Sequence, residues 1–456
     1  MIFSNLNQVV KSGLLTNDVE EKISLREKQN RRLKADVESV LSCREWIKTI
    51  TNNNFDSTRI LGVVAVTKGA EYYLPYTIPK IIKQISEIGM MADIVIGLNN
   101  GFECQSVIEG FSLIPNVQVI HLYTDEKIAN NIPAKIFDNP RCEGESYYLK
   151  NIDYQNSPHR IFVLHQREGE FTAGKIRVLG DIYGSLLLKS IENGWIPPAL
   201  LVTFDAESQF FVEREFSVFE PESNGLMLII SELQKHLEID ILGARDKYTV
   251  YQRSIADETK VLLPNFNEEV PPIQWFLNSV HGIYNGYKWL PGGGTVGKTD
   301  VLISILTVIS RKYPGARIED TQLTILAKHA GFLGKIFTHV SYTNRTPHLT
   351  DMTIDKPLKK AWVEQIFRWN TAYQGLELCY GFHNVRLIVS DRFPWSIFTA
   401  PIKFLKRLKG RDKVNLYTVF HKVKVLAIAF STSRNIKKKS LENPDILQGS
   451  KTKASW

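Results

Sequence analysis

The sequence lacks any uninterrupted apolar run of the roughly 18 residues that a membrane-spanning helix requires. Its longest apolar runs, around Val301–Ile309 and Val423–Phe430, have lengths that suit buried helices or strands. The first residues, Met1 to Asn5, also lack a basic region followed by an apolar one, so no signal peptide is predicted. We therefore expect a cytoplasmic protein.

Cysteine is scarce and scattered. The four cysteines have no C-x-x-C spacing, which argues against a disulfide framework or a structural zinc site and is typical of a reducing compartment. They are Cys43, Cys104, Cys142 and Cys379. The histidines show no metal-ligand spacing either, so structural roles are predicted for them, including His165, His281, His329, His348 and His383.

The net charge of +8 is unevenly distributed. Residues 431–456 carry six basic and two acidic side chains, so half of the excess lies in a short polar tail that is predicted to be disordered. Little positive charge remains for the body, and we expect no nucleic-acid partner. The 456 residues, 43% hydrophobic and 23% charged, suit a globular protein with two or more lobes.

The order of apolar runs after residue 58 predicts an α/β fold. Ile60–Val66, Ile94–Leu98 and Val117–Leu122 are β-branched apolar runs typical of buried strands, and a helical pattern follows the first. This alternation indicates a mostly parallel central sheet with helices on both faces. Residues 18–50 predict an N-terminal helical segment that packs on this body.

Polar residues follow the first two predicted strands. Thr67 and Lys68, with Glu71 just beyond, follow the first strand, and Asn99 follows the second. Ligands of parallel sheets bind at the carboxyl ends of the strands. These four residues are therefore candidates for ligand binding.

Asp205-Ala206-Glu207 ends the predicted buried strand at residues 199–204. Alternation along a strand would place the two carboxylates on one side of the backbone. Two hard oxygen ligands at a strand end suit Mg²⁺ or Mn²⁺ held together with substrate phosphates. A solvated turn is an equally good interpretation of this motif taken alone.

Glu319-Asp320 precedes a helix predicted at residues 321–330. Acidic residues in the first turn of a helix are ordinarily capping residues, and taken alone this interpretation is favoured. Its position after the acid pair suggests a second role, in which a carboxylate takes the proton from an attacking hydroxyl.

Gln365, Arg368 and Trp369 lie at positions i, i+3 and i+4 of a predicted helix and so share one face. Arginine can chelate phosphate oxygens with its planar fork. Tryptophan offers a flat apolar surface for a sugar ring, and glutamine both donates and accepts hydrogen bonds. Taken alone, the motif is better interpreted as an ordinary amphipathic helix with a core tryptophan.

These motifs, in this order, resemble those of glycosyltransferase family 2, which has the type A nucleotide-sugar fold. The similarity is greatest to the branch that includes the cellulose and hyaluronan synthases, and it extends roughly from Arg59 to Gly375. The segments that carry it are Phe204-Asp205-Ala206-Glu207, Pro291-Gly292-Gly293-Gly294-Thr295, Ile318-Glu319-Asp320-Thr321-Gln322-Leu323 with Gly331, and Gln365-x-x-Arg368-Trp369.

The resemblance implies a metal-dependent, inverting transfer of a sugar from a nucleotide-sugar donor to a hydroxyl acceptor. Asp320 would be the catalytic base, and Asp205 and Glu207 would hold Mg²⁺ or Mn²⁺. Donor binding would involve Thr67, Lys68, Glu71, Asn99, Lys175, Asp205 and Arg368. Contacts to acceptor and pyrophosphate would come from Gly293, Gly294, Thr295, Glu319, Gln365 and Trp369.

We expect the chain to be organised in four segments. Residues 1–57 would be an N-terminal helical extension and residues 58–350 the nucleotide-sugar-binding and catalytic domain. Residues 351–430 would be a C-terminal helical region, and residues 431–456 the basic tail.

Two features depart from the family pattern. Asn99 and Asn100 stand where the family has carboxylates that help to recognise uracil, so the donor base is open, with uridine as the default. The transmembrane helices of the synthases are also missing, so export of a polymer across a bilayer is not expected.

A competing motif covers residues 292–299, which satisfy the P-loop pattern G-x-x-x-x-G-K-[ST] with Lys298 as its lysine. Leu387–Asp391 could then be the magnesium-binding strand. A P-loop must follow a buried strand directly, whereas Tyr284–Pro291 is polar, aromatic and interrupted by glycine and proline. A P-loop-type nucleotide triphosphatase is therefore the alternative function, and a catalytically inactive nucleotide-sugar-binding module is a third.

Residues 393–413 form a basic amphipathic segment. Phe398, Ile402 and Leu405 form one apolar stripe with basic residues around it. Such a helix suits an anionic membrane surface, which would make the protein peripheral on the inner face of a membrane. A helix packed on the body with a solvated basic face is an equally good interpretation.

Overall fold

The computed structural model describes most of the chain up to residue 345 and a short segment near residue 380. The described residues are 17–66, 70–98, 110–111, 113–123, 149, 158–165, 175–214, 218–220, 223–253, 262–265, 290–313, 319–345, 379–381 and 384. Within them, no helix combines the length and the apolarity that crossing a bilayer requires.

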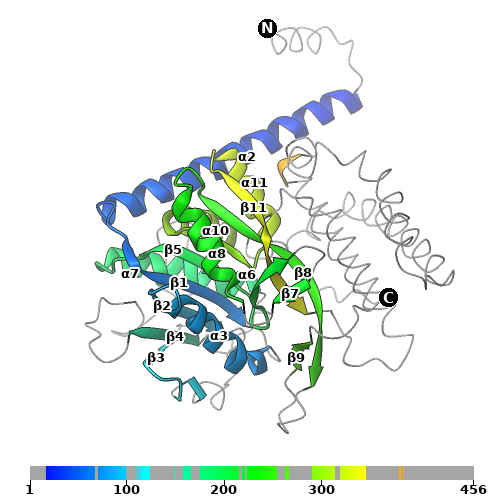
Figure 1. Ribbon diagram of the computed structural model, residues 1–456. Coiled ribbons are helices and arrows are strands. Elements are labelled where there is room, and N and C mark those ends of the chain that lie inside the picture. Colours follow the sequence, from blue (N-terminus) through cyan, green and yellow to red (C-terminus); the bar gives the residue numbers. More distant parts are fainter. Residues whose placement is uncertain are drawn as a thin grey trace, which may run out of the picture.

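One twisted sheet forms the centre of the described part (Figure 1). Its first half is parallel, in the order β3-β4-β2-β1-β5. These strands are β1 (Asp56–Val66), β2 (Met91–Leu98), β3 (Val117–Tyr123), β4 (His159–His165) and β5 (Pro198–Thr203). Ile60 to Val66 of β1 are all buried, as a strand covered on both faces requires.

The second half of the sheet is mixed. β10 (Thr295–Lys298) runs antiparallel between β5 and β8 (Ile241–Arg253), and β11 (Gly334–Arg345) is parallel to β8. The remaining strands pair antiparallel and are β6 (Phe210–Arg214), β7 (Val218–Glu220) and β9 (Leu262–Asn265). The predicted α/β fold with a mostly parallel sheet is confirmed.

Helices cover both faces of the sheet and bury two apolar cores. One core lies under α6 (Lys175–Asp181), the π-helical η3 (Ile182–Leu187), α7 (Leu188–Glu192), α10 (Thr299–Lys312) and α11 (Glu319–His329). The other lies under α3 (Leu74–Ser86) and α8 (Gly225–Lys235), with η1 (Glu71–Tyr73) leading into α3. The expectation of helices on both faces is also confirmed.

The long helix α2 (Asn17–Ile50) lies across α10 and α11 on the outside of the molecule (Figure 1). Four side chains spaced three, four or seven residues apart form its buried stripe, namely Leu33, Val40, Cys43 and Ile47. The buried Asp36 carboxylate on the same stripe accepts hydrogen bonds from Lys312 (2.9 Å), Tyr313 (2.5 Å) and Tyr380 (2.9 Å). This cluster joins α2, the end of α10 and the segment at residues 379–381.

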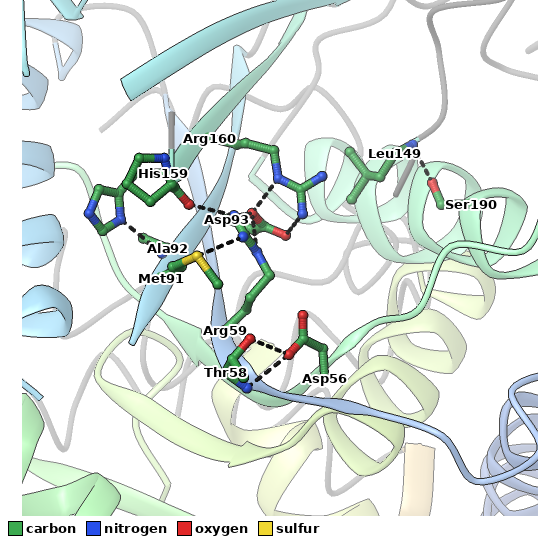
Figure 2. A network of polar contacts seen from close by, with 11 residues as sticks. Asp56, Thr58, Arg59, Met91, Ala92, Asp93, Leu149, His159, Arg160 and Ser190 are labelled. Carbon is green, nitrogen blue, oxygen red and sulfur yellow. Dashed lines mark hydrogen bonds and ion pairs between the residues drawn. The ribbon is translucent and has the colours of Figure 1, made fainter. Parts of the chain in front are cut away.

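A buried ion cluster ties β1, β2 and β4 together near their amino ends (Figure 2). Asp93 accepts hydrogen bonds from Arg59 (Nε 3.0 Å, Nη2 2.6 Å) and from Arg160 (Nε 2.6 Å, Nη2 2.5 Å). Beside it, His159 Nδ1 accepts the Ala92 N–H at 3.0 Å. Because Asp93 is fully buried, these bonds fix the order and register of the three strands.

Candidate functional site

The carboxyl ends of β1, β2 and β5 lie side by side at one edge of the sheet. Val66 of β1 pairs with Leu98 of β2, and Val63 of β1 pairs with Thr203 of β5. The chain leaves β1 just before Thr67 and β2 just before Asn99. Glu71 is buried in η1, which follows β1. Thr67, Lys68, Glu71 and Asn99, the four predicted binding residues, therefore come shortly after β1 or β2 at this edge. Asp205 comes after β5 at the same edge.

The acid motif forms a turn at the end of β5. The strand ends at Thr203, and the Ser208 N–H donates to the Asp205 carbonyl at 3.0 Å, which closes the turn. The two acids therefore lie in a turn rather than in the strand. Burial still alternates along this turn: Phe204 and Ala206 are buried in the core, and Asp205 and Glu207 are partly exposed. The buried neighbours anchor the turn and leave both carboxylates near the surface.

The glycine-rich segment lies directly against this turn. The Gly294 N–H donates to the Thr203 carbonyl at 2.7 Å, and the Gly294 carbonyl accepts the Ala244 N–H at 2.8 Å. Gly294 has φ +72°, a left-handed conformation that other residues rarely adopt, so glycine is required here. The backbone of Gly293, Gly294 and Thr295 is thereby fixed beside the residues that precede Asp205.

Two further hydrogen bonds bring the first turn of α11 to the same place. The Leu290 N–H, just before the glycine-rich segment, donates to Thr324 Oγ1 at 3.0 Å. Thr324 Oγ1 in turn donates to the Asp320 carbonyl at 3.0 Å. Asp320 is partly exposed, and Glu319 begins the helix. The acid turn, the glycine-rich segment and the Asp320 turn are thus connected through short polar contacts.

The structure places only part of the predicted site. Lys175 and Glu319 begin α6 and α11, and only their backbone is described. Six other predicted residues lie outside the described residues, namely Thr67, Lys68, Asn99, Gln365, Arg368 and Trp369. The whole third motif therefore stays a prediction, as does the basic segment at residues 393–413.

Asp205 and Glu207 suit a divalent cation that is shared with a substrate. Within the described part of the chain, no group of three or more histidine, cysteine or acidic side chains could hold a metal by itself. Magnesium is usually bound by one or two carboxylates together with substrate phosphates and water. Two partly exposed carboxylates on one hydrogen-bonded turn fit that mode of binding.

The structure contradicts the P-loop interpretation of residues 292–299. A P-loop is an open loop between a strand and a helix, whose amides surround phosphates. Here Thr295 to Lys298 form β10, paired on both sides. Lys298 pairs with Leu200 near the amino end of β5, and its Nζ donates to Asp240 (2.9 Å) and to the Leu237 carbonyl (2.8 Å). The lysine therefore binds protein groups at the opposite edge from Asp205.

Sequence reasoning missed a histidine pair at the same carboxyl edge. His121 of β3 and His165 of β4 approach within 2.9 Å, from Nδ1 to Nε2. Burial, and to a smaller extent the His121 ring, lower the pKa of His165 to about 4. His121 lies in the strand predicted at Val117–Leu122, but the pairing of β3 with β4 is visible only in the structure, so the sequence held no signal for this pair.

Comparisons with known proteins identify no family. No protein-family model matches the chain, and no curated protein matches it significantly. Among solved structures, the chain is similar to a mannosyltransferase, PcManGT from Pyrobaculum calidifontis, in complex with GDP-Man and Mn²⁺. The identity is 10%, the TM-score is 0.35, and 93% of this chain and 97% of that chain are covered.

A second similarity is to S. aureus TarS 1-349 in complex with UDP-GlcNAc, at 10% identity and a TM-score of 0.30. It covers 86% of this chain and 89% of that chain. A longer S. aureus TarS structure matches at 8% identity and a TM-score of 0.33, with 83% and 55% covered. Identities and TM-scores this low do not establish a function for this chain.

Proposed function

We propose that this chain is a type A glycosyltransferase that moves a sugar from a nucleoside-diphosphate donor to a hydroxyl group. One observation supports this most strongly. The acid turn at Asp205, the glycine-rich segment and the first turn of α11 adjoin one another at the carboxyl edge of a mostly parallel sheet. Ligands of open α/β sheets bind at that edge, where groups of opposite chemical role can face one substrate.

Asp205 and Glu207 would hold Mg²⁺ or Mn²⁺ on the outside of the turn. When bound, the ion neutralises charge on the diphosphate and so makes it a better leaving group. The fixed turn keeps the two carboxylates in place before the substrate arrives, which lowers the cost of reorganisation during the reaction.

Asp320 would act as the base. Its carboxylate accepts the proton of the acceptor hydroxyl while that oxygen forms a bond to the anomeric carbon. The bond from this carbon to the diphosphate oxygen breaks, and its electron pair leaves with the diphosphate. Attack from the side opposite to the leaving group inverts the anomeric configuration. The Thr324 contact to the Asp320 carbonyl anchors this turn against the glycine-rich segment.

The finer parts of the proposal concern residues beyond the described ones. Gln365, Arg368 and Trp369 would contact pyrophosphate and acceptor, in keeping with membership of family 2. Thr67, Lys68 and Asn99 would contact the donor nucleoside, with uridine as the default base.

The test is a matched pair of variants, Asp320→Asn and Lys298→Ala. Release of nucleoside diphosphate from a panel of UDP- and GDP-sugars with Mn²⁺ is measured, because water as acceptor needs the same base. We expect Asp320→Asn to lose about a hundredfold or more in rate and Lys298→Ala to keep the wild-type rate.

Each alternative gives a different result. A wild-type rate in Asp320→Asn would show that Asp320 is not the base. With ATP or GTP in place of the sugar donors, hydrolysis by the wild type that only Lys298→Ala loses would restore the nucleotide triphosphatase interpretation. Donor binding by the wild-type chain without any release would indicate an inactive binding module.

A further inference from the structure

The two imidazole rings of His121 and His165 lie edge to edge and form one flat surface. Their centroids are 5.2 Å apart and their planes differ by 17°. The facing nitrogens are 2.9 Å apart. The centroid–centroid distance exceeds this nitrogen–nitrogen distance by the sum of the two ring radii, that is, the distance from each centroid to its own nitrogen. Both nitrogens therefore lie on the line between the centroids, and the rings are nearly coplanar. One ring donates an N–H to the lone pair of the other.

This flat surface lies at the carboxyl edge, on the β1 side of the acid turn. His165 pairs with Leu98, the last residue of β2, and with Tyr123, the last residue of β3. From Asp205 to His165 the edge crosses β5, β1, β2 and β4. At the usual spacing between strands this is about 14 Å.

The other side of the acid turn is already occupied. β10 follows β5 there, and the glycine-rich segment and the Asp320 turn lie against it. A nucleoside diphosphate carries its base and its terminal phosphate at opposite ends. With the diphosphate at Asp205, the nucleoside therefore extends along the ends of β1, β2 and β4, towards the histidine pair.

The pair is also chemically suited to an aromatic ligand. The lowered pKa of His165, caused mainly by burial, keeps its ring uncharged at neutral pH. Both rings are only partly buried. The two coplanar rings together present a wide flat face, and every nucleobase has a flat face that can stack on it.

We propose that the His121–His165 pair is the stacking surface for the nucleobase of the donor. This inference rests on the proposed function and adds to it the residues that hold the base. Stacking strengthens the binding of any base and discriminates little between them. Recognition of a particular base would then come from other groups, among them residues that follow β2.

The experiment compares a ligand with a base to one without. Calorimetry measures the binding of UDP, GDP, CDP and ADP, and separately of inorganic pyrophosphate, each with Mn²⁺. His165→Ala and His121→Ala should each weaken the binding of the preferred nucleoside diphosphate about tenfold, the effect of losing a typical base–aromatic contact. Binding of pyrophosphate should not change.

Two further variants sharpen the result. His165→Phe keeps a flat ring and should retain most of the affinity that His165→Ala loses. His236→Ala removes an exposed histidine beside Glu232 and Glu238, just after α8, and should bind every ligand as the wild type does. If His165→Ala does not fold, as judged by thermal melting, His121→Ala on the edge strand β3 decides the question.

The proposal is overturned if the alanine variants bind nucleoside diphosphates as tightly as the wild type. It is equally overturned if the alanine variants lose as much affinity for pyrophosphate as for nucleoside diphosphates, because the pair would then not act through the base. A wild-type protein that binds no nucleoside diphosphate would overturn the proposed function as well, so the two failures differ.

Discussion

Single hydrogen bonds decide which of the predicted residues lie together. Gly294 reaches Thr203 through its N–H, and Thr324 joins Leu290 to the Asp320 carbonyl. Asp205 and Asp320 could be selected from the sequence because acids at the end of a strand or the start of a helix have a recognisable chemistry. Thr324 could not, because a threonine inside a helix shows no sign of its partner 34 residues away.

The histidines differ in their surroundings, which the sequence does not show. A sequence shows only that no metal-ligand spacing exists. Whether a histidine is charged depends on what surrounds it, and this is a property of the folded chain. His159 is buried and accepts the Ala92 N–H on Nδ1, which protonation of that nitrogen would break. Burial lowers its pKa below the usual value.

We expect the stability of the protein to fall as the pH is lowered from about 7 towards 4. The pKa of His165 is about 4 in the folded chain and about 6.5 in an unfolded one, so between these values the unfolded state binds more protons. His159 contributes in the same direction. Urea unfolding at several pH values measures the slope, and His165→Phe should make it shallower. Equal slopes in both proteins would contradict this assignment.

Among the helices and strands, the buried ion cluster and the helix α2 stabilise the fold in different ways. The Asp93 cluster crosses three parallel strands and fixes their register (Figure 2). α2 covers α10 and α11 with one apolar stripe. The helix at residues 18–50 and its packing on the body were predicted, and α2 confirms them. The Asp93 cluster was not predicted, because a charged residue in a strand resembles an exposed one when only the sequence is known.

Asp93→Asn should destabilise the protein by about 3–5 kcal/mol, because two buried guanidinium groups lose the charge that they share. Chemical denaturation measures the change. Asp56→Asn is the control, since it is less buried and its Oδ1 bonds to Thr58 suit an amide as well. We expect the control to change stability by no more than about 0.5 kcal/mol. A similar small change in Asp93→Asn would show that the cluster is not needed.

Ile47→Ala and Ile50→Ala test the packing of α2 with the same substitution at two positions. Ile47 is fully buried, and its truncation should cost about 2–5 kcal/mol. Ile50, at the end of the helix, is 44% exposed, and its truncation should lower the free energy of unfolding by about 0.5 kcal/mol or less. Thermal melting with circular dichroism provides both values. Equal costs would mean that α2 does not pack on the body through this stripe.

Across the molecule, one sheet joins the described parts of the candidate site. The parallel half presents the ends of β1, β2 and β5, and the mixed half presents the glycine-rich segment and, through it, α11. A ligand at this edge would therefore contact both halves. Its binding free energy would add to the stability of the whole described body.

The protein should be stabilised by a nucleoside diphosphate only when a divalent cation is present. A ligand at 100 times its dissociation constant adds about 2.7 kcal/mol to the free energy of unfolding. Thermal melting with UDP, GDP, CDP or ADP and Mn²⁺ measures the shift, and a chelator should abolish it. Asp205→Asn and Glu207→Gln should reduce it. Absence of a shift with every nucleotide would contradict nucleotide-sugar binding.

The class of the fold follows from the sequence, as do the positions of acidic residues at the ends of its elements. Runs of buried β-branched residues are typical of strands covered on both faces, and the types of residue at their ends are visible without coordinates. Folding brings these residues together, places Lys298 at the opposite edge of the sheet, and sets His121 and His165 in one plane. The reason is that strand order and register join residues far apart in the chain, and no local pattern encodes them.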